Sequence, residues 1–529
     1  MPVRRRLFAL LLAAALSATL LTSPAQATGR PRVDVVGLGV AEARALLESR
    51  RVTSVELVRE YLRRIDAYEN AYAGQPGVNA LITVNRRALG DAARLDAERR
   101  AGRTRGPLHG VPIVVKDNFD TADLPTTSGS LALADLRPRD DATQIRRLRD
   151  AGAIILAKAN LHEFAMNITT ISSLGGQTRN PYDQRRHPGG SSGGTAAAVA
   201  ASFATAGMGT DTCGSIRIPA AHNNLVGLRP TLGLSSRDGV APLAGTQDTA
   251  GPIAGSVRDV ALLLDATVGY DREDPVTAAS TGRIPRSYLG ALNEKSLRGK
   301  RIGVFSDYFG STPSEQRTTG LVRAAIADMT AAGAHAVELG PQPEIMTAAA
   351  GANRVRDEFE RDLDAYLADA NGKPRELARL EPPYREITLA DIATSGQVTP
   401  SVLTTLRNWV GSPALPNPAY EEKLRQRGIL QAGLTGLMAE HDLDALVYPT
   451  ISEPPTMIGT SQSYLNCRLA GYSGFPALSV PAGFTADGLP VGVELLGPPF
   501  SEPDLLGMAY AYEQRTAHRT PPASTPPLG

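Results

Sequence analysis

Two glycine- and serine-rich stretches and one lysine carry residue types suited to nucleophilic catalysis. The stretches are PGGSSGGT (188–195) and GMGTDTCGSIRIP (207–219). A serine hydroxyl attacks effectively at neutral pH only after a base has taken its proton. Lys116 follows the apolar run GVPIVV (110–115), where burial would lower its pKa enough for the uncharged amine to act as that base. The residues equally permit Lys116 to pair with the adjacent Asp117 at the surface.

The glycine-rich residues also permit other interpretations. An isolated GGSSGG is typical of a flexible loop, and glycine-rich loops before helices can bind phosphate. A nucleotide-binding P-loop is excluded, because no Gly-Lys-Ser/Thr follows. Residues 190–194 match the G-x-S-x-G motif around Ser192, but that motif requires a preceding strand, and residues 180–188 are polar with two prolines. The candidate bases for such a site are His222, His335, His441 and His518, none of which lies in a distinctive motif.

The two serine loops need intervening structure that returns them to one place. The alanine-rich residues 195–206 predict a helix, in which residues 196–206 would span about 16 Å. A loop, a helix, a short strand and a second loop would then bring both serine loops to one site. Short apolar and amphipathic segments alternate along the rest of the chain, which predicts an α/β fold around a buried sheet. Strands are predicted at 111–115, 153–157, 301–305 and 445–448, and helices at 55–67, 195–206 and around 359–367.

The overall composition disfavours several functional classes. The chain has 529 residues with 55 Lys and Arg against 54 Asp and Glu, so it lacks the basic surplus of a dedicated nucleic-acid-binding protein. Two cysteines are too few for a disulfide scaffold or a four-cysteine zinc site. The length permits several domains or one large α/β core.

The two ends of the chain have their own patterns. Arginines at 4–6, an apolar run at 7–21 and Ala25-Gln26-Ala27 predict a secretory signal peptide over residues 1–27, by either the general or the twin-arginine route. The apolar run is shorter than the roughly 20 residues that span a bilayer, so no stable membrane span is expected. A secreted or extracytoplasmic location follows. Residues 520–529 are rich in Pro and Thr and are predicted to form a flexible tail.

Three sequence blocks resemble the amidase signature hydrolases, a family that includes fatty acid amide hydrolase, peptide amidases and the glutamyl-tRNA amidotransferase A subunit. The blocks are HGVPIVVKD (109–117), GGSSGG (189–194) and GTDTCGSIRIP (209–219). The resemblance implies a single large α/β domain with a central mixed β-sheet surrounded by helices. That domain would cover residues 28–519, with a signature core at about 105–260, a variable substrate-shaping region at about 270–460 and a C-terminal block at about 464–516.

The resemblance also implies a Ser-cisSer-Lys triad. By motif position, Ser215 would be the nucleophile, Ser191 the bridging serine beside a cis peptide bond, and Lys116 the terminal base. Backbone N–H groups of the second loop would bind the oxyanion of the tetrahedral intermediate. Lys158 is expected to be structural. The oxyanion loop would comprise Thr212, Cys213, Gly214 and Ser215, supported by Ser192, Thr210, Asp211 and Arg217, the last two as a pair.

The function implied is that of a secreted hydrolase that cleaves carboxylic or peptide amide C–N bonds through a Ser215 acyl-enzyme and releases ammonia or an amine. No metal or cofactor is expected, and the expected partner is a small-molecule or peptide amide rather than nucleic acid. Residues 358–367 resemble the peptide-amidase branch, which favours C-terminal peptide amides, with aryl and acyl amides as other substrates. A catalytically silent binding protein and an amidotransferase-type subunit are the alternatives.

The chain departs from the commonest family pattern at Cys213, where a glycine usually precedes the Gly-Ser pair. A thiol nucleophile is one interpretation of this residue, although Ser215 occupies the motif position. Cys467 is the only other cysteine and lies just before the C-terminal block. Because export would place both thiols in an oxidising compartment, we hypothesise a disulfide between Cys213 and Cys467.

Overall fold

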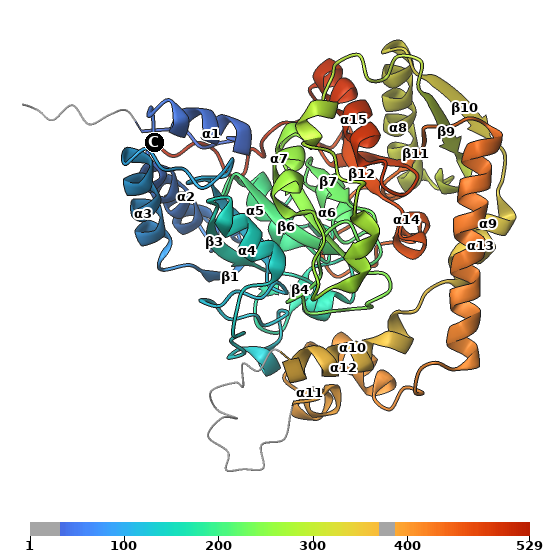
Figure 1. Cartoon of the computed structure of the whole chain (residues 1–529), viewed down its shortest axis with the longest axis horizontal. Helices are drawn as coiled ribbons and strands as arrows, with labels where there is room; N and C mark the ends of the chain where they lie inside the picture. Colours follow the sequence, from blue (N-terminus) through green and yellow to red (C-terminus); the bar gives the residue numbers. More distant parts are fainter. Residues whose placement is uncertain (1–31, 370–386) are drawn as a thin grey trace, which may run out of the picture. The chain divides into compact units, whose positions relative to one another are not determined.

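Eleven strands form one mixed sheet in the part of the chain that the structure, a computed structural model, describes: residues 32–369 and 387–529 (Figure 1). The strand order is β1-β3-β2-β6-β8-β7-β12-β13-β11-β9-β10. Strand β2 runs parallel to β3 and β6, and β9 runs parallel to β10 and β11, whereas the other neighbours are antiparallel. The strands are β1 (Leu81–Val84), β2 (Pro112–Lys116), β3 (Ile154–Ala159), β6 (Ala206–Asp211), β7 (Val226–Arg229), β8 (Thr249–Ala254), β9 (Arg301–Phe305), β10 (His335–Leu339), β11 (Ala445–Pro449), β12 (Ala477–Phe484) and β13 (Pro490–Leu496), and β4 (Ile171–Ser172) pairs with β5 (Gly176–Gln177) in a small separate sheet.

Helices surround this sheet, so the predicted α/β class and the single mixed-sheet domain are confirmed (Figure 1). The helices α10 (Val355–Asp369), α11 (Leu389–Ser395) and α12 (Pro400–Trp409) share an apolar cluster that includes Phe359, Leu363 and Leu406. No helix among the described residues is both long and apolar enough to cross a membrane. The helices are α1 (Val40–Glu48), α2 (Ser54–Tyr68), α3 (Ala88–Arg100), α4 (Thr143–Asp150), α5 (Gly193–Ala200), α6 (Arg217–His222), α7 (Val257–Thr267), α8 (Pro313–Ala331), α9 (Pro343–Gly351), α10 (Val355–Asp369), α11 (Leu389–Ser395), α12 (Pro400–Trp409), α13 (Pro418–Glu440), α14 (Arg468–Ser473) and α15 (Glu502–Thr516).

The predicted helix at 195–206 is wrong in its extent. Helix α5 begins at Gly193 and ends at Ala200, and residues from Ala206 onward form strand β6 instead. The helix ends in a turn, because Ser202 has a φ of +58° and the Phe203 N–H donates to the carbonyl oxygen of Ala198 at 2.8 Å. Residues 206–208 then lie in register beside 113–115 of β2, and the whole of β6 pairs with β8. The helix still returns the chain to the sheet, so the two serine loops meet as expected.

Helix α5 is wholly buried, and its small residues allow that burial. A Cβ atom on Gly194 would lie 2.2 Å from the carbonyl oxygen of Asn160, so a larger residue would push the helix off β3. Strands β2, β3 and β6 are also buried along their full length. The serine loops therefore begin and end on tightly packed elements.

The C-terminal residues 520–529 are packed, in contrast to the predicted flexible tail. Arg64 of α2 donates hydrogen bonds to the carbonyl oxygens of Thr525 (2.7 Å) and Pro526 (2.9 Å), and Tyr72 donates to that of Ser524 (2.7 Å). Thr525 is buried. Proline-rich composition suggested disorder, but the carbonyl oxygens of this segment, which turns at residues 523–525, satisfy side-chain donors of α2 and Tyr72. The predicted signal peptide, residues 1–27, lies outside the described residues.

Candidate active site

Lys116 is the last residue of β2, and its side chain is fully buried. Its Nζ lies 2.7 Å from Ser191 Oγ and 2.7 Å from Thr210 Oγ1. Burial lowers the pKa of Lys116 to about 7, although Asp248 and Asp211 act in the opposite direction. A substantial fraction of this amine is therefore uncharged at neutral pH, as a base requires.

Asp117 does not pair with Lys116, which decides between the two interpretations of the lysine. Asp117 pairs instead with Lys158 of β3, at 3.1 Å between Oδ1 and Nζ, and both side chains are inaccessible to solvent. Asp117 also accepts a hydrogen bond from the hydroxyl of Thr127, and Lys158 donates to Thr126 Oγ1 at 2.8 Å. The contacts of Lys158 join β3 to the loop that follows β2.

The loop that carries Ser191 has a tightly constrained backbone. The Gly190–Ser191 peptide bond is cis, as the sequence resemblance implied. Gly189 has a φ of +77°, and a Cβ atom there would lie 2.9 Å from Pro219 Cα. The carbonyl oxygen of Ser191 accepts a hydrogen bond from the N–H of His162 at 3.0 Å. These contacts fix the loop, and with it the Ser191 hydroxyl beside Lys116.

Ser215 lies on the second loop, which joins β6 to α6, and backbone hydrogen bonds hold the two loops together. The N–H of Ser192 donates to the carbonyl oxygen of Ser215 at 3.2 Å. The Ser192 hydroxyl donates to the carbonyl oxygen of Thr210 at 3.2 Å and accepts from the Thr210 N–H at 3.3 Å. Ser191, Ser192, Thr210 and Lys116 thus meet at the end of β6, where the Ser215 loop begins.

Ser192 and the four candidate histidines do not form a hydrolase site of the G-x-S-x-G type. The Ser192 hydroxyl is engaged by both backbone groups of Thr210. His222 Nε2 instead faces the carbonyl oxygen of Glu453 at 3.3 Å. His335 lies on β10 at the far edge of the sheet, opposite β1. His441 follows the last residue of α13, and the His518 ring packs against Tyr512 of α15. The interpretation based on that motif is therefore wrong.

The backbone N–H groups of the Ser215 loop are divided between two roles. Gly214 N–H donates to Asp211 Oδ1 at 2.8 Å, and Ile216 N–H donates to Asp211 Oδ2 at 3.2 Å. The sequence assigned Gly214 N–H to an oxyanion, but the Asp211 carboxylate already occupies it. In the described parts of the chain, the loop N–H groups without an acceptor are those of Thr212, Cys213 and Ser215.

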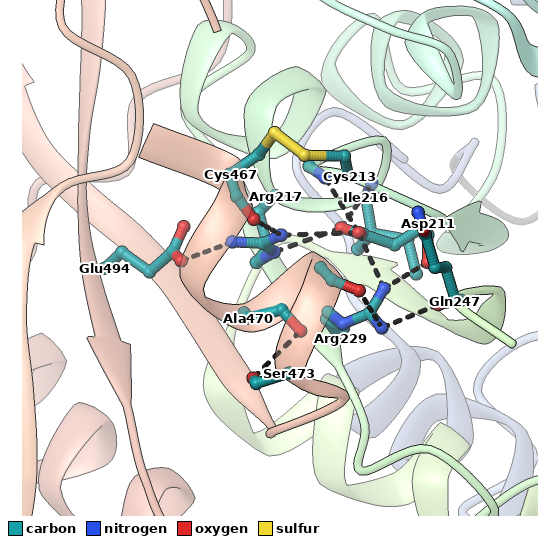
Figure 2. Close-up of a disulfide and its surroundings, with 12 residues drawn as sticks. Asp211, Cys213, Ile216, Arg217, Arg229, Gln247, Cys467, Ala470, Ser473 and Glu494 are labelled. Atoms are coloured by element: carbon teal, nitrogen blue, oxygen red, sulfur yellow. Dashed lines mark hydrogen bonds and ion pairs between the residues drawn. A yellow bond between two sulfur atoms is a disulfide. The ribbon is translucent and has the colours of Figure 1, made fainter. Parts of the chain in front are cut away.

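A cluster of buried charged side chains around Asp211 holds the loop that carries Ser215 (Figure 2). Arg217 Nε lies 3.0 Å from Asp211 Oδ2, as expected, and Arg229 Nη1 lies 3.0 Å from Asp211 Oδ1. Arg217 also pairs with Glu494 of β13. Burial raises the pKa of Asp211, but Arg217 and Arg229 outweigh it and hold that pKa well below its usual range. Asp211 therefore stays charged and continues to accept the hydrogen bonds from the loop N–H groups.

Three residues near the site lie in no recognisable motif and were not identified from the sequence. Asp248 accepts a hydrogen bond from the Thr212 hydroxyl and from the N–H groups of residues 243 and 244. Asn118 donates to Thr210 Oγ1 at 3.1 Å, and only its proximity to Lys116 in the sequence could have indicated it. Glu494 lies 277 residues from its partner Arg217, so no local pattern links them.

Cys213 and Cys467 form the hypothesised disulfide (Figure 2). Their Cα atoms are 5.0 Å apart, although the two residues are separated by 254 positions in the sequence. The bond ties the Ser215 loop to the start of α14. An oxidised Cys213 has no thiolate to offer, so the interpretation of Cys213 as a nucleophile does not fit this structure.

Sequence and structure comparisons agree on the protein family of the chain. The family model described as Amidase matches residues 56–506. The A subunit of the glutamyl-tRNA(Gln) amidotransferase from Halorhodospira halophila is 38% identical over 500 residues, which cover 90% of this chain and 97% of that protein. The peptide amidase from Stenotrophomonas maltophilia is 39% identical with a TM-score of 0.81, over 92% of this chain and 99% of that one.

A solved structure with lower sequence identity also belongs to an amidase. An amidase family protein from Bacillus anthracis is 30% identical with a TM-score of 0.78, over 92% of each chain. The family match, the sequence identity and the shared fold each extend over most of the chain. We conclude that the chain belongs to the amidase signature family and is an amide C–N hydrolase by class.

Proposed function

We propose that the chain hydrolyses amide bonds with Ser215 as nucleophile, Ser191 as proton relay and Lys116 as base. The observation that carries this proposal is the 2.7 Å contact between the buried Nζ of Lys116 and Ser191 Oγ. Arginine could not replace this lysine, because arginine does not lose its proton in proteins. The burial that lowers the pKa of Lys116 is what prepares the amine for proton transfer.

Acylation begins when Ser191 passes its proton to Lys116 and takes the proton of Ser215. The Ser215 oxygen attacks the amide carbonyl carbon, and a tetrahedral intermediate forms. When the C–N bond breaks, Ser191 protonates the leaving nitrogen and regains a proton from the Lys116 ammonium. Ammonia or an amine leaves, and the acyl group stays on Ser215 as an ester.

Deacylation repeats this sequence with water. Ser191 takes a proton from the attacking water while Lys116 again accepts the proton that Ser191 gives up. The second tetrahedral intermediate collapses, Ser215 recovers its proton through Ser191, and a carboxylic acid leaves. In both intermediates the N–H groups of Cys213 and Ser215, together with that of Thr212, are the donors available to the oxyanion.

We propose peptides that end in a C-terminal amide as substrates. Helix α10 contacts the segment that follows Lys116 and the segment that precedes Asp248, because the Tyr366 hydroxyl donates to Asp120 Oδ1 at 2.6 Å and Glu358 accepts from the Thr246 N–H at 2.9 Å. Asp120 follows Lys116 closely, and Thr246 lies two residues before Asp248. The variable region thus borders the site, and the relative from Stenotrophomonas maltophilia is a peptide amidase.

An amidotransferase component is the second candidate, favoured by 38% identity to the A subunit of such an enzyme. The chemistry at Ser215 would be the same, with ammonia passed to a partner protein instead of being released. The Cys213–Cys467 disulfide favours the hydrolase, because disulfides persist mainly in oxidising compartments outside the cytosol. We propose export of the chain for the same reason, together with the N-terminal signal pattern.

The test is amide hydrolysis by the purified chain without any partner. A panel of peptide amides, acyl amides, aryl amides and glutamine is scored by ammonia or amine release. We expect peptide amides to react, Ser215→Ala to abolish turnover, and Ser49→Ala, an exposed serine after α1, to leave it unchanged. A fluorophosphonate should label the wild type but not Ser215→Ala. Full activity of Ser215→Ala would overturn the proposal, and release of ammonia from glutamine alone would favour the amidotransferase.

A further inference from the structure

Resting on the proposed function, we propose that Cys467 is a positioning residue for the oxyanion donors. Its disulfide to Cys213 holds the loop N–H groups in their working orientation, and reduction of the bond lowers kcat. Cys467 lies outside the three sequence blocks that define the triad. It acts through Cys213 and does not touch the reacting atoms.

The loop depends on a few fixed points. The N–H groups of Thr212, Cys213 and Ser215 gain no restraint from hydrogen bonds within the described chain, because they have no acceptor there. Restraint comes from the Gly214 and Ile216 N–H groups on Asp211 and from the Thr212 hydroxyl on Asp248. The Ser192 N–H also holds the carbonyl oxygen of Ser215. The disulfide is the restraint attached at Cys213 itself.

Cys467 is a rigid anchor for that restraint. It is only 1% exposed. Its carbonyl oxygen accepts from Arg217 Nη2 at 3.3 Å, and its N–H donates to the carbonyl oxygen of Tyr464 at 3.2 Å. The preceding Asn466 donates from Nδ2 to the carbonyl oxygen of Pro449, the last residue of β11, at 2.8 Å. The anchor is therefore tied to the sheet through Asn466 and to the buried charges through Arg217, which Figure 2 draws beside Cys467.

Helix α14, which follows Cys467, lies directly against the loop. A Cβ atom on Gly471 would lie 2.8 Å from the carbonyl oxygen of Thr212 and 3.0 Å from Cys213 Cα. The two backbones thus approach as closely as a glycine allows. A change in the spacing between Cys213 and α14 must therefore move the loop, because no gap separates them.

Reduction changes this spacing. A dithiol reductant supplies two electrons and two protons, the S–S bond breaks, two thiols form, and the reductant becomes a disulfide. Two unbonded sulfur atoms cannot remain at bonding distance, so the side chains of Cys213 and Cys467 must separate. Oxyanion donors act mainly on the transition state, so their displacement lowers kcat and leaves KM nearly unchanged.

The experiment compares the wild type, the dithiothreitol-reduced wild type, Cys467→Ala, Ser473→Ala and Ser215→Ala on one peptide amide, below the unfolding temperature of every form. Ser473→Ala is the matched control, because Ser473 also lies on α14 but its hydroxyl donates to the Leu469 carbonyl oxygen. For the two forms without the disulfide, we expect kcat to fall about 10- to 100-fold, with KM changed less than about threefold. Ser473→Ala should keep the wild-type kcat.

A peptide aldehyde supplies a second readout, because its adduct with a serine carries an oxyanion. Its affinity should fall in parallel with kcat in Cys467→Ala and recover when reduced wild type is reoxidised. Wild-type kcat in Cys467→Ala, or an equal loss in Ser473→Ala, would overturn the role of Cys467 while Ser215→Ala remains inactive. If Ser215→Ala is active, the proposed function itself fails. Should Cys467→Ala not fold, the reduced wild type provides the same comparison.

Discussion

Thr210 Oγ1 lies 2.7 Å from Nζ of Lys116 and also accepts a hydrogen bond from Asn118 Nδ2 at 3.1 Å. A neutral amine has two N–H groups and one lone pair. Because Thr210 is an acceptor for one N–H, the lone pair can face the Ser191 hydroxyl, from which Lys116 must take a proton. Thr210 thus orients the proposed base.

Replacement of Thr210 by valine should lower kcat/KM about 10- to 100-fold. Valine matches the shape of threonine but leaves one N–H of Lys116 without its acceptor and frees the amine to rotate away from Ser191. Thr210→Ser is the matched control, because it keeps the hydroxyl and should retain most activity. Steady-state kinetics on a peptide amide measure both. Equal losses in the two variants would show that the methyl group matters and the hydroxyl does not.

The fall of kcat/KM at low pH should follow the protonation of Lys116. Burial lowers the pKa of this amine to about 7. Protonated lysine cannot accept the proton of Ser191, so kcat/KM should fall tenfold per pH unit below about pH 7 and level off above it. Measurement of kcat/KM from pH 5 to 9 in buffers of constant ionic strength gives the profile. A flat profile across this range would contradict the role of Lys116 as base.

Stability should depend on the same titration. In the unfolded chain Lys116 is protonated below about pH 10.4, whereas in the folded chain its pKa is about 7. Between these values the unfolded state binds one more proton, so folding becomes more favourable as the pH rises. Relative to Lys116→Met, the free energy of unfolding of the wild type should rise by up to about 1.4 kcal/mol per pH unit from pH 7 to 10. Parallel denaturation curves of the two proteins at all pH values would exclude this shift.

Some parts of this picture could be read from local sequence. The apolar run before Lys116 predicted β2 within one residue, because a strand buried on both faces is continuously apolar. The serine blocks identified both loops. Helix 195–206 was predicted too long, because the chain turns at Ser202, which has a φ of +58°, despite the helical preference of the neighbouring alanines. Local propensity also carries no information about the pairing with β8 that residues 206–211 then adopt.

Other parts depend on contacts that no local pattern encodes. Nothing near Gly214 in the sequence indicates that the Asp211 carboxylate occupies its N–H. The pair Asp117–Lys158 joins different strands, and sequence adjacency instead suggested Lys116 as the partner of Asp117. The disulfide was inferred from the predicted export together with the presence of only two cysteines, and such an inference works only at low cysteine counts.

Lys158→Met should destabilise the fold by about 3 to 5 kcal/mol, because it leaves the Asp117 carboxylate buried without its counter-ion. The double variant Lys158→Met with Asp117→Leu should recover part of that loss, since the unpaired charge is gone. Lys300→Met is the matched control: Lys300 pairs with Asp444 at a partly exposed site, and its loss should cost at most about 1 kcal/mol. Urea denaturation measures all three. Equal costs at Lys158 and Lys300 would refute the buried pair as the cause.

Removal of residues 520–529 should lower the free energy of unfolding by about 2 to 4 kcal/mol, because Arg64 loses the carbonyl acceptors of Thr525 and Pro526 and the Tyr72 hydroxyl loses that of Ser524. Pro527→Ala, at an exposed position of the same segment, keeps every one of these acceptors and should change stability by less than about 0.5 kcal/mol. Urea denaturation of the truncated chain and of Pro527→Ala beside the full chain measures the difference. If the truncated chain is as stable as the full chain, residues 520–529 contribute nothing to the fold, whereas a loss confined to the truncation assigns the effect to the contacts of this segment.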